Sequence, residues 1–256
     1  MLAYDRDATL LPKIIKANGG FADSLKALVE RVDIIFIAVS GDGFEQVVKD
    51  IMPFLREGQI LSDVSSTKQS PVAALSLAPK GVKVIGGHPM AGTEHKGFDY
   101  SSSSMFKDCV WVLCPVDGYS VPNELIRFVT DIGAGRTIVC SPEDHDAAVA
   151  AVSHGVQVSA TSLASAVNDI VGDNELAWTL AAGGFRDSTR IAESSSEMWI
   201  PILIENKNNV LKSIDANIER LKSFKVALNE ENIKDIGQLI GDGNAARNEW
   251  AENKGK

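Results

Sequence analysis

The chain has few of the features that mark several broad classes of protein. Its net charge is -9, with 25 Lys and Arg against 34 Asp and Glu, so it has no basic excess for contacting nucleic-acid phosphates. No apolar run reaches the roughly 18 residues of a membrane helix, and the acidic start does not have the form of a signal peptide. We therefore expect a cytoplasmic protein with no nucleic-acid partner and no membrane partner.

Cysteine is scarce as well. Cys109, Cys114 and Cys140 have neither the spacing of a metal site nor the even number of a disulfide set. We expect reduced thiols and no metal. The remaining composition, 45% hydrophobic and 23% charged, is that of an ordinary globular protein, and 256 residues suffice for one large domain or two modest ones.

Up to residue 142, short apolar runs alternate with helical patterns. The run from Asp33 to Val39 is continuous and β-branched, as expected of a strand covered on both faces. Strands that alternate with helices predict βαβ units and a mostly parallel sheet, so we assign residues 1–142 to an α/β domain. The expected strands are 33–39, 59–63, 82–85, 109–113 and 137–139, and the clearest helices are 43–55 and 68–77.

From residue 143 to 256 the pattern becomes helical throughout. Helices are expected at 147–167, 198–224 and 229–250. Their long apolar stretches need a partner surface, so we expect a homodimer formed by this all-helical domain. A doubly wound domain followed by a helical one is a common dehydrogenase plan, with the active site beyond the carboxyl ends of the strands near the domain junction.

An acidic residue, Asp5, ends the first short apolar stretch and precedes a helical segment. At the end of a strand in a dinucleotide-binding fold, such a carboxylate accepts hydrogen bonds from ribose hydroxyls and repels the extra phosphate of NADP. Asp5 therefore favours NAD over NADP, although Arg6 beside it complicates that preference. The alternative role is a helix N-cap, which Asp7 is also placed to supply.

Two motifs follow predicted strands. In Asp63-Val-Ser-Ser-Thr-Lys68, hydroxyls and backbone amides can reach the nicotinamide end of a cofactor or a substrate; the alternative is that one hydroxyl caps the following helix. In Gly86-Gly-His-Pro-Met-Ala-Gly-Thr-Glu94, the glycines allow close ligand approach and a proline stiffens the chain after His88. A histidine held there is placed to act as a general base, although a lone histidine is more often structural.

The helical half carries a histidine and two arginines of interest. His154 ends a Val-Ser-His run on the first long helix. Arg186 and Arg190 are four residues apart, so they lie roughly on one helical face, and arginine binds carboxylates through paired hydrogen bonds. The alternative for the arginines is a surface ion pair with Asp187 or Glu193.

In this order the motifs resemble the prephenate/arogenate dehydrogenase family of tyrosine biosynthesis, from Asp5 to about Asn209. The resemblance implies a Rossmann-like domain, a helical dimerisation domain, and an NAD-linked oxidoreductase acting on prephenate, with arogenate as the alternative substrate. The most specific matches are Asp-Val-Ser-Ser-Thr-Lys, Gly-Gly-His-Pro-Met-Ala-Gly-Thr-Glu, Met105-Phe106 leading to Pro115, His145-Asp146, Val-Ser-His, Gly-Gly-Phe-Arg-Asp-Ser-Thr-Arg-Ile-Ala and Met198-Trp199.

The resemblance also implies roles for individual residues. His88 withdraws the proton from the ring hydroxyl while hydride leaves the same carbon for the nicotinamide and the ring carboxylate departs as carbon dioxide. Ser66 hydrogen-bonds the histidine and the substrate hydroxyl, and Arg190 holds a substrate carboxylate. The other substrate-binding positions are His154, Thr93, Glu94 and Asp187, and the cofactor-binding positions are Asp5, Arg6, Val39, Ser40 and Ser65.

The sequence departs from the family pattern in two places. His154 is followed by Gly155-Val-Gln where many members have Leu-Pro-His, and a glycine within a helix costs about 1 kcal/mol relative to alanine and can mark a kink. The family's first strand and Gly-x-Gly-x-x-Gly turn are also missing, since the stretches at 41–43 and 241–243 have neither the spacing nor the position. We therefore expect the active protein to begin upstream of Met1, because of a mis-called start or a truncated gene.

Two other interpretations remain. A hydroxyacid dehydrogenase with a catalytic lysine on a helix leaves the His-Pro-Met and Phe-Arg-Asp-Ser-Thr-Arg motifs unexplained. A non-catalytic remnant that only dimerises is favoured by the missing glycine turn, and it is opposed by the retention of Ser66, His88, His154 and Arg190. A measurement of NAD affinity distinguishes the remnant from the enzyme, because a non-catalytic remnant should not bind NAD.

Overall fold

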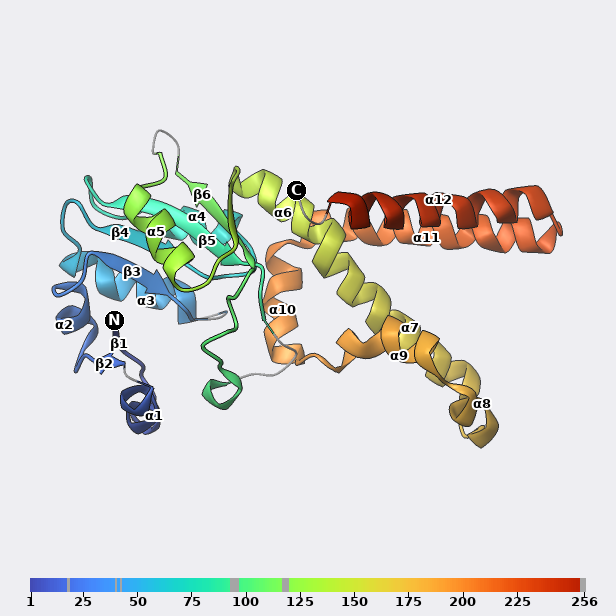
Figure 1. The fold of residues 1–256 in the computed structure, drawn as a ribbon, viewed down its shortest axis with the longest axis horizontal. Helices are drawn as coiled ribbons and strands as arrows, with labels where there is room; N and C mark the ends of the chain where they lie inside the picture. Colours follow the sequence, from blue (N-terminus) through green and yellow to red (C-terminus); the bar gives the residue numbers. More distant parts are fainter. Residues whose placement is uncertain (18, 40, 42, 93–96, 117–119, 254–256) are drawn as a thin grey trace.

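A central five-stranded sheet forms the core of the first half in the computed structural model, which describes residues 1–17, 19–39, 41, 43–92, 97–116 and 120–253 (Figure 1). The strand order is β3-β4-β5-β6-β7, and all neighbours run parallel except β5 and β6, so the expected mostly parallel sheet is confirmed. The strands are β3 (Ile34–Ile37), β4 (Ile60–Asp63), β5 (Lys83–Pro89), β6 (Val110–Pro115) and β7 (Arg136–Val139).

Helices cover both faces of this sheet, because successive residues of a strand point to opposite faces. Ile35 and Leu61 face one side and belong to a buried cluster that includes residues of α3 and α4. Ile60 and Ile85 belong to a second cluster with residues of α5. The covering helices are α3 (Gly43–Ile51) with the short η2 (Met52–Phe54), α4 (Gln69–Leu75) and α5 (Asn123–Asp131); η3 (Phe98–Tyr100) lies between β5 and β6 in sequence.

A separate two-stranded parallel sheet, β1 with β2, lies at the N-terminus. Among the described residues, no strand bridges β1 and β3. Asp7 caps the helix that follows β1, because its carboxylate accepts the N–H of Thr9 at 2.9 Å; the cap considered for Asp5 therefore belongs to Asp7. These elements are β1 (Leu2–Ala3), η1 (Ala8–Leu10), α1 (Leu11–Lys16), β2 (Gly20–Phe21) and α2 (Leu25–Val29).

The described residues of the second half form helices joined by short connections, and no strand lies among them, as expected. The expected single helix over 198–224 is wrong, because it breaks at Asn206, whose φ of -101° and ψ of 22° leave helical geometry. The elements are α6 (Pro142–Val149), η4 (Ala150–His154), α7 (Gly155–Val171), α8 (Glu175–Leu180), α9 (Gly183–Thr189), η5 (Arg190–Glu193), α10 (Ser196–Glu205), α11 (Lys207–Asn229) and α12 (Ile233–Asn253).

The first long helix changes geometry just before Gly155. α6 continues into η4, which is π-helical, and then into α7. A Cβ on Gly155 would lie 2.0 Å from Oγ and 2.8 Å from Cβ of Ser213, so glycine permits the close approach of α7 and α11. The distortion expected at this glycine is thus a π-helical turn, a feature that is frequent at functional sites.

The helical half leaves large apolar side chains exposed. α7 and the hairpin of α11 and α12 extend away from the sheet (Figure 1). Ile170 on α7 is 85% exposed and Ile233 on α12 is 84% exposed. No helix in the described part of the chain has the length and apolar character needed to cross a membrane. Exposed apolar surface of this kind is typical of contact with another protein chain.

Candidate active site

His88 lies near the carboxyl end of β5, one strand away from the end of β4. The glycine-histidine motif is part of β5, not a loop after the strand as expected, because the antiparallel β6 extends the ladder and pairs His88 with Val112. A Cβ on Gly87 would lie 2.4 Å from the carbonyl oxygen of Asp63. The close approach that this glycine permits is therefore to the neighbouring strand β4.

A chain of hydrogen bonds leads from His88 to a buried carboxylate on α6. Nδ1 of His88 lies 2.8 Å from Nε2 of His145, and Nδ1 of His145 lies 2.8 Å from Oδ1 of Asp146. The exposed fractions of the three residues are 9%, 2% and 1%. The chain couples a strand of the α/β half to the first helix of the helical half.

The direction of each hydrogen bond between His88, His145 and Asp146 decides which ring nitrogens carry protons, as assigned from the hydrogen-bond network. An ionised Asp146 only accepts hydrogen bonds, so Nδ1–H of His145 donates to it. Nε2 of a neutral His145 is then an acceptor, and Nδ1–H of His88 donates to it. The lone pair of His88 is left on Nε2, which is the nitrogen that can take a proton from a substrate.

Burial and nearby groups set the charges of His88 and Asp146. Burial lowers the pKa of His88 well below its usual value, and the nearby His145 and Lys68 lower it further. Burial raises the pKa of Asp146, but hydrogen bonds from His145 and from two backbone N–H groups at the start of α4 outweigh it and hold that pKa below its usual value. A neutral histidine and an ionised carboxylate are the forms that base catalysis near neutral pH requires.

The Asp146 carboxylate also caps helix α4. Its Oδ1 accepts the N–H of Lys68 at 2.7 Å, and its Oδ2 accepts the N–H of Gln69 at 2.9 Å. The helix has no side-chain cap from its own N-cap residue, so the expectation that a hydroxyl of the Ser-Ser-Thr turn caps it is wrong. A carboxylate from a distant helix satisfies these amides and interacts favourably with the helix dipole.

A buried ion pair between Asp63 and Lys68 holds the peptide that precedes His88. Nζ of Lys68 donates to the carbonyl oxygen of Gly87 at 2.6 Å, and Oδ1 of Asp63 accepts the N–H of Gly87 at 2.9 Å. Burial lowers the pKa of Lys68, while the charge of Asp63 opposes that change. Oδ2 of Asp63 also accepts the N–H of Ser65 at 2.9 Å, which fixes the start of the Ser-Ser-Thr turn.

His154 is buried between the π-helical turn and the break of α10 from α11. Nδ2 of Asn206 lies 3.2 Å from Nδ1 of His154, and the Trp199 ring packs edge-on at 5.9 Å between centroids. Burial lowers the pKa of His154 to about 4, against an opposing effect of Asp146. Nδ2 of Asn206 also donates to the backbone carbonyl of Asp146 at 2.7 Å. His154 therefore belongs to one buried polar cluster with the hydrogen-bond relay of His88, His145 and Asp146.

Ser66 lies on the turn beside this cluster and is half-buried. Among the described residues, no hydrogen bond links Ser66 to His88. The next residue, Thr67, donates its hydroxyl to the carboxylate of Glu205 at the end of α10. The turn is therefore attached to the helical half through Thr67.

The arginine motif lies on α9 and η5. Arg190 is exposed at the start of η5, and no described hydrogen bond joins it or Asp187 to His88. Nε of Arg186 lies 2.9 Å from Oδ1 of Asp187, with both side chains largely exposed. The surface ion pair considered for Arg186 is confirmed.

The predicted cofactor positions follow strands of the two sheets. Asp5 follows β1, and its Oδ1 accepts the N–H of Asp7 at 2.8 Å. Arg6 is exposed, and Val39, which follows β3, is 39% exposed. Carboxyl ends of parallel strands are where nucleotide-binding sheets hold their ligands. Three predicted positions lie outside the described residues: Ser40, Thr93 and Glu94.

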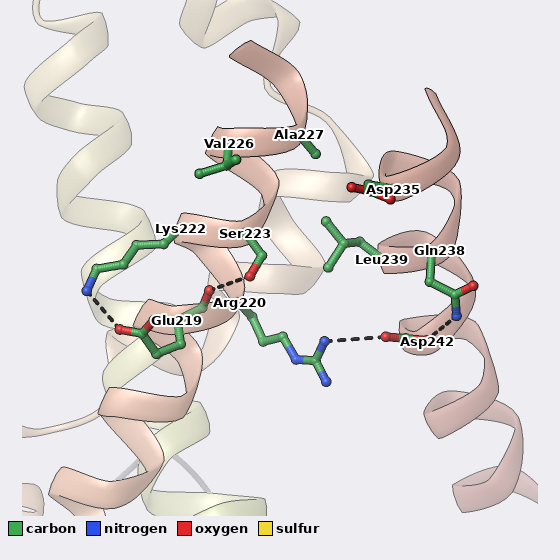
Figure 2. Close-up of a pocket in the computed structure, with 10 residues that line it drawn as sticks. All are labelled: Glu219, Arg220, Lys222, Ser223, Val226, Ala227, Asp235, Gln238, Leu239 and Asp242. Atoms are coloured by element: carbon green, nitrogen blue, oxygen red, sulfur yellow. Dashed lines mark hydrogen bonds and ion pairs between the residues drawn. The ribbon is translucent and has the colours of Figure 1, made fainter. Parts of the chain in front are cut away.

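A hollow of about 520 Å³ lies elsewhere, between α11 and α12 (Figure 2). Arg220 of α11 reaches across it to Asp242 of α12 at 3.3 Å, and Lys222 pairs with Glu219 at 2.8 Å along α11. These charged side chains are exposed and already paired with one another. The buried titratable groups lie at His88, so we place the candidate active site there.

Sequence reasoning missed several members of the buried cluster. The sequence shows His145 and Asp146 only as a match to the family pattern, although two adjacent titratable residues at a helix start near the domain junction are a usable signal. Asn206 and the ion pair of Asp63 with Lys68 were not singled out. Their partners are distant in sequence, so the local pattern carries no sign of them.

Family comparisons match both halves of the chain. The model described as prephenate dehydrogenase, nucleotide-binding domain, matches residues 2–140, and the model described as prephenate dehydrogenase, dimerization domain, matches residues 141–241. The first match already begins at residue 2, so it does not support the expectation of a start upstream of Met1.

Individual relatives agree with the family match. Prephenate dehydrogenase of Lactococcus lactis subsp. cremoris is 33% identical over 226 residues, which are 86% of this chain and 60% of that protein. The chain thus spans about 60% of the length of that curated relative.

Solved structures show the same fold. Prephenate dehydrogenase from A. aeolicus in complex with hydroxyphenyl propionate and NAD+ is 26% identical, with a TM-score of 0.85 over 97% of this chain and 88% of that chain. Synechocystis arogenate dehydrogenase is 25% identical, with a TM-score of 0.81 over 97% of this chain and 90% of that chain.

Proposed function

This chain belongs to the prephenate dehydrogenase family, and we propose that it converts prephenate to 4-hydroxyphenylpyruvate by NAD-dependent oxidative decarboxylation, a step of tyrosine biosynthesis. One observation carries the proposal above all. The buried hydrogen-bond chain from His88 through His145 to Asp146 leaves the lone pair of His88 on Nε2, where it can act as a general base.

The proposed reaction begins when Nε2 of His88 takes the proton of the ring hydroxyl. The O–H electron pair forms a C=O bond as hydride leaves the same carbon, and bound NAD+ supplies the acceptor for that hydride. The bond from the ring to its carboxylate then breaks, carbon dioxide leaves, and the bond electrons make the ring aromatic as the oxygen regains a proton. The positive charge on His88 lies next to a relay that ends at the Asp146 carboxylate, which stabilises it.

The substrate contacts are proposed from the same cluster and from the arginine motif. Ser66 contacts the ring hydroxyl and Arg190 holds a carboxylate of the substrate. Nε1 of Trp199 is buried without a hydrogen-bond partner among the described residues, and its ring packs against His154, so a substrate oxygen near these rings would satisfy it. The remaining proposed contacts are Thr93, Glu94 and Asp187.

The residues at the strand ends fit part of a bound NAD. Asp5 lies just beyond β1, after Tyr4, and its Oδ1 accepts the N–H of Asp7, which leaves its second oxygen for the ribose hydroxyls. A carboxylate there also disfavours the extra phosphate of NADP. The sequence contains no strand followed by Gly-x-Gly-x-x-Gly, so contacts to the pyrophosphate are the part that these residues do not supply. The other proposed cofactor contacts are Arg6, Val39, Ser40 and Ser65.

We also propose that the chain divides after residue 142 and that residues 143–256 form a homodimer. The last strand ends at Val139, and Ser141 caps α6 by accepting the N–H of Asp144 at 3.0 Å, so the proposed division lies close to the change from strand to helix. The match to a dimerization domain and the exposed apolar side chains on α7 and α12 support the dimer. Analytical ultracentrifugation should give twice the chain mass, and a monomer at micromolar concentration contradicts the proposal.

Arogenate is the second candidate substrate. The likeness to Synechocystis arogenate dehydrogenase favours it. The Gly155-Val-Gln stretch in place of Leu-Pro-His also leaves the preference between the two substrates open. Arogenate differs from prephenate in carrying an amine and a carboxylate on its side chain where prephenate carries a ketone and a carboxylate. A comparison of kcat/KM for the two substrates decides between them.

The test of the proposed function is NADH formation by the chain with NAD+ and either prephenate or arogenate. His88→Asn is the matched variant, because it keeps a polar side chain of similar reach and removes the base. Turnover that falls by roughly 10²–10⁴ in the variant supports the proposal, since that is the usual contribution of a general base. A folded wild-type chain that turns over neither substrate contradicts it.

A further inference from the structure

We propose that Asn206 is a positioning residue that fixes the tautomer of His154, so that His154 presents an uncharged Nε2–H to a carboxylate oxygen of the substrate. The proposal rests on the proposed function for the identity of the ligand, and on the geometry around Asn206 for the tautomer. Asn206 occupies the break between α10 and α11, where the sequence alone predicts continuous helix.

The amide of Asn206 is held in a single orientation. Asn206 is 3% exposed, and its Nδ2 lies 2.7 Å from the carbonyl oxygen of Asp146. Its Oδ1 accepts a hydrogen bond from Nδ2 of Asn209 at 2.9 Å. A flipped amide would place Oδ1 against the Asp146 carbonyl and an N–H against the Asn209 donor, which are two repulsive contacts in a buried site. Nδ2 of Asn206 is therefore the group that faces His154.

The orientation of Asn206 decides the protonation of His154. An amide N–H only donates, so Nδ1 of His154, at 3.2 Å, must accept and its proton must lie on Nε2. Burial lowers the pKa of His154 to about 4, so the ring stays neutral near pH 7. The groups of α6 that face it and titrate are Asp146 and His145; the groups that face it from α10 and α11, Trp199 and Asn206, do not titrate.

An uncharged donor suits a carboxylate that must leave. A cation at this position would stabilise the ring carboxylate in the bound substrate and oppose its loss as carbon dioxide. A neutral N–H orients the same carboxylate oxygen but stabilises the charged carboxylate of the bound substrate less than a cation would. The nearby Nε1 of Trp199, buried and without a partner among the described residues, is a second uncharged donor in this part of the site.

The first test is spectroscopic and needs no turnover. A long-range ¹H–¹⁵N correlation spectrum of the wild-type chain should show His154 protonated at Nε2, with its signals assigned by comparison with His154→Gln. A wild-type spectrum with the proton on Nδ1, or with a doubly protonated ring near pH 7, overturns the proposal. A failure of the proposed enzymatic function leaves this measurement unaffected, so the two outcomes are distinguishable.

The second test reverses the donor. In Asn206→Asp a carboxylate faces Nδ1, so the proton of His154 should move to Nδ1 and its pKa should rise above the wild-type value. Asn217→Asp on the same helix is the matched control, because Asn217 is exposed and contacts Ser159 at 2.8 Å, and its spectrum should not change at His154. If Asn206→Asp does not fold, Asn206→Leu removes the donor without adding charge, and His154 should then populate both tautomers.

Kinetics supply the third readout. Asn206→Asp should raise KM for prephenate on the order of tenfold, the usual effect of losing a hydrogen bond to a charged group, with a smaller change in kcat. The Asn217→Asp control should keep both constants. A folded Asn206→Asp variant with the wild-type tautomer and wild-type KM contradicts the assignment of Asn206 as a positioning residue.

Discussion

Replacing His145 by phenylalanine tests the buried relay most directly. Phenylalanine has a ring of similar size and no nitrogen, so the variant keeps most of the packing against His88 and removes both relay hydrogen bonds, each 2.8 Å long. Nδ1–H of His88 loses its acceptor, and His88 is then no longer held with its lone pair on Nε2. Asp146 keeps its hydrogen bonds to the start of α4, so the rest of the cluster should persist.

The size of the effect follows from the interactions lost. A buried donor left without its partner costs roughly 1–3 kcal/mol, which is about 5- to 150-fold in kcat/KM if it is expressed in the transition state. His145 also lowers the pKa of His88. His88 acts as a base only when neutral, so activity falls as pH drops through its pKa; the higher pKa in His145→Phe should move that fall to higher pH.

The assay is the initial rate of NADH formation across a pH series, with a thermal melt to confirm folding. Glu143→Gln on the exposed side of the same helix is the control and should behave as wild type. A double variant with His88→Asn should be no slower than His88→Asn alone, because residues that act through one another are not additive. Additive losses in the double variant, or a folded His145→Phe with unchanged kcat/KM and pH profile, refute the relay.

Three further predictions concern stability and cofactor binding. The pKa of His154 is about 4 in the fold against about 6.5 in model peptides, so below pH ~6.5 the unfolded chain takes up a proton that the folded chain does not. The free energy of unfolding should therefore be highest above pH ~6.5 and decrease by up to roughly 3 kcal/mol as pH falls toward 4. Urea titrations should show a shallower decrease in His154→Gln. Gly155→Ala should destabilise the fold by about 1–3 kcal/mol in thermal melts because its Cβ meets Ser213, and Ser213→Ala should recover part of the loss; equal stability of Gly155→Ala and wild type contradicts the close packing of α7 on α11. Asp5→Asn should weaken NAD binding on the order of tenfold in a fluorescence titration, and an unchanged Kd excludes the ribose role.

The sequence predicts the five strands of the central sheet. Continuous β-branched runs such as 33–39 predict buried strands, because a strand covered on both faces needs apolar residues at every position, and β3 lies within that run. The position of the glycine-histidine motif is predicted in part by the same means, since a motif expected at the carboxyl end of a strand does bring His88 near that end of β5. The sequence predicts the motif after the strand, because local patterns do not reveal its antiparallel pairing with β6.

The helical half shows where local patterns fail. Apolar spacing predicts one helix over 198–224, because both α10 and α11 carry the same 3.6-residue period. The chain breaks at Asn206, whose side chain bonds to Asp146, 60 residues earlier, and to His154, 52 residues earlier. These contacts satisfy buried polar groups of α6 and η4, and nothing in the sequence near residue 206 indicates them.

The sequence by itself determined the alternation of strands and helices in the first half, the acidic net charge of the chain, and the histidine that we propose as its base, because composition and periodicity are properties of short stretches. Only the tertiary structure decided which nitrogen of His88 carries its lone pair. That choice depends on His145, 57 residues away on a helix of the other half, and on the Asp146 carboxylate to which His145 is hydrogen-bonded. The direction of a hydrogen bond is set by both of its partners, and chain folding alone brings these partners together.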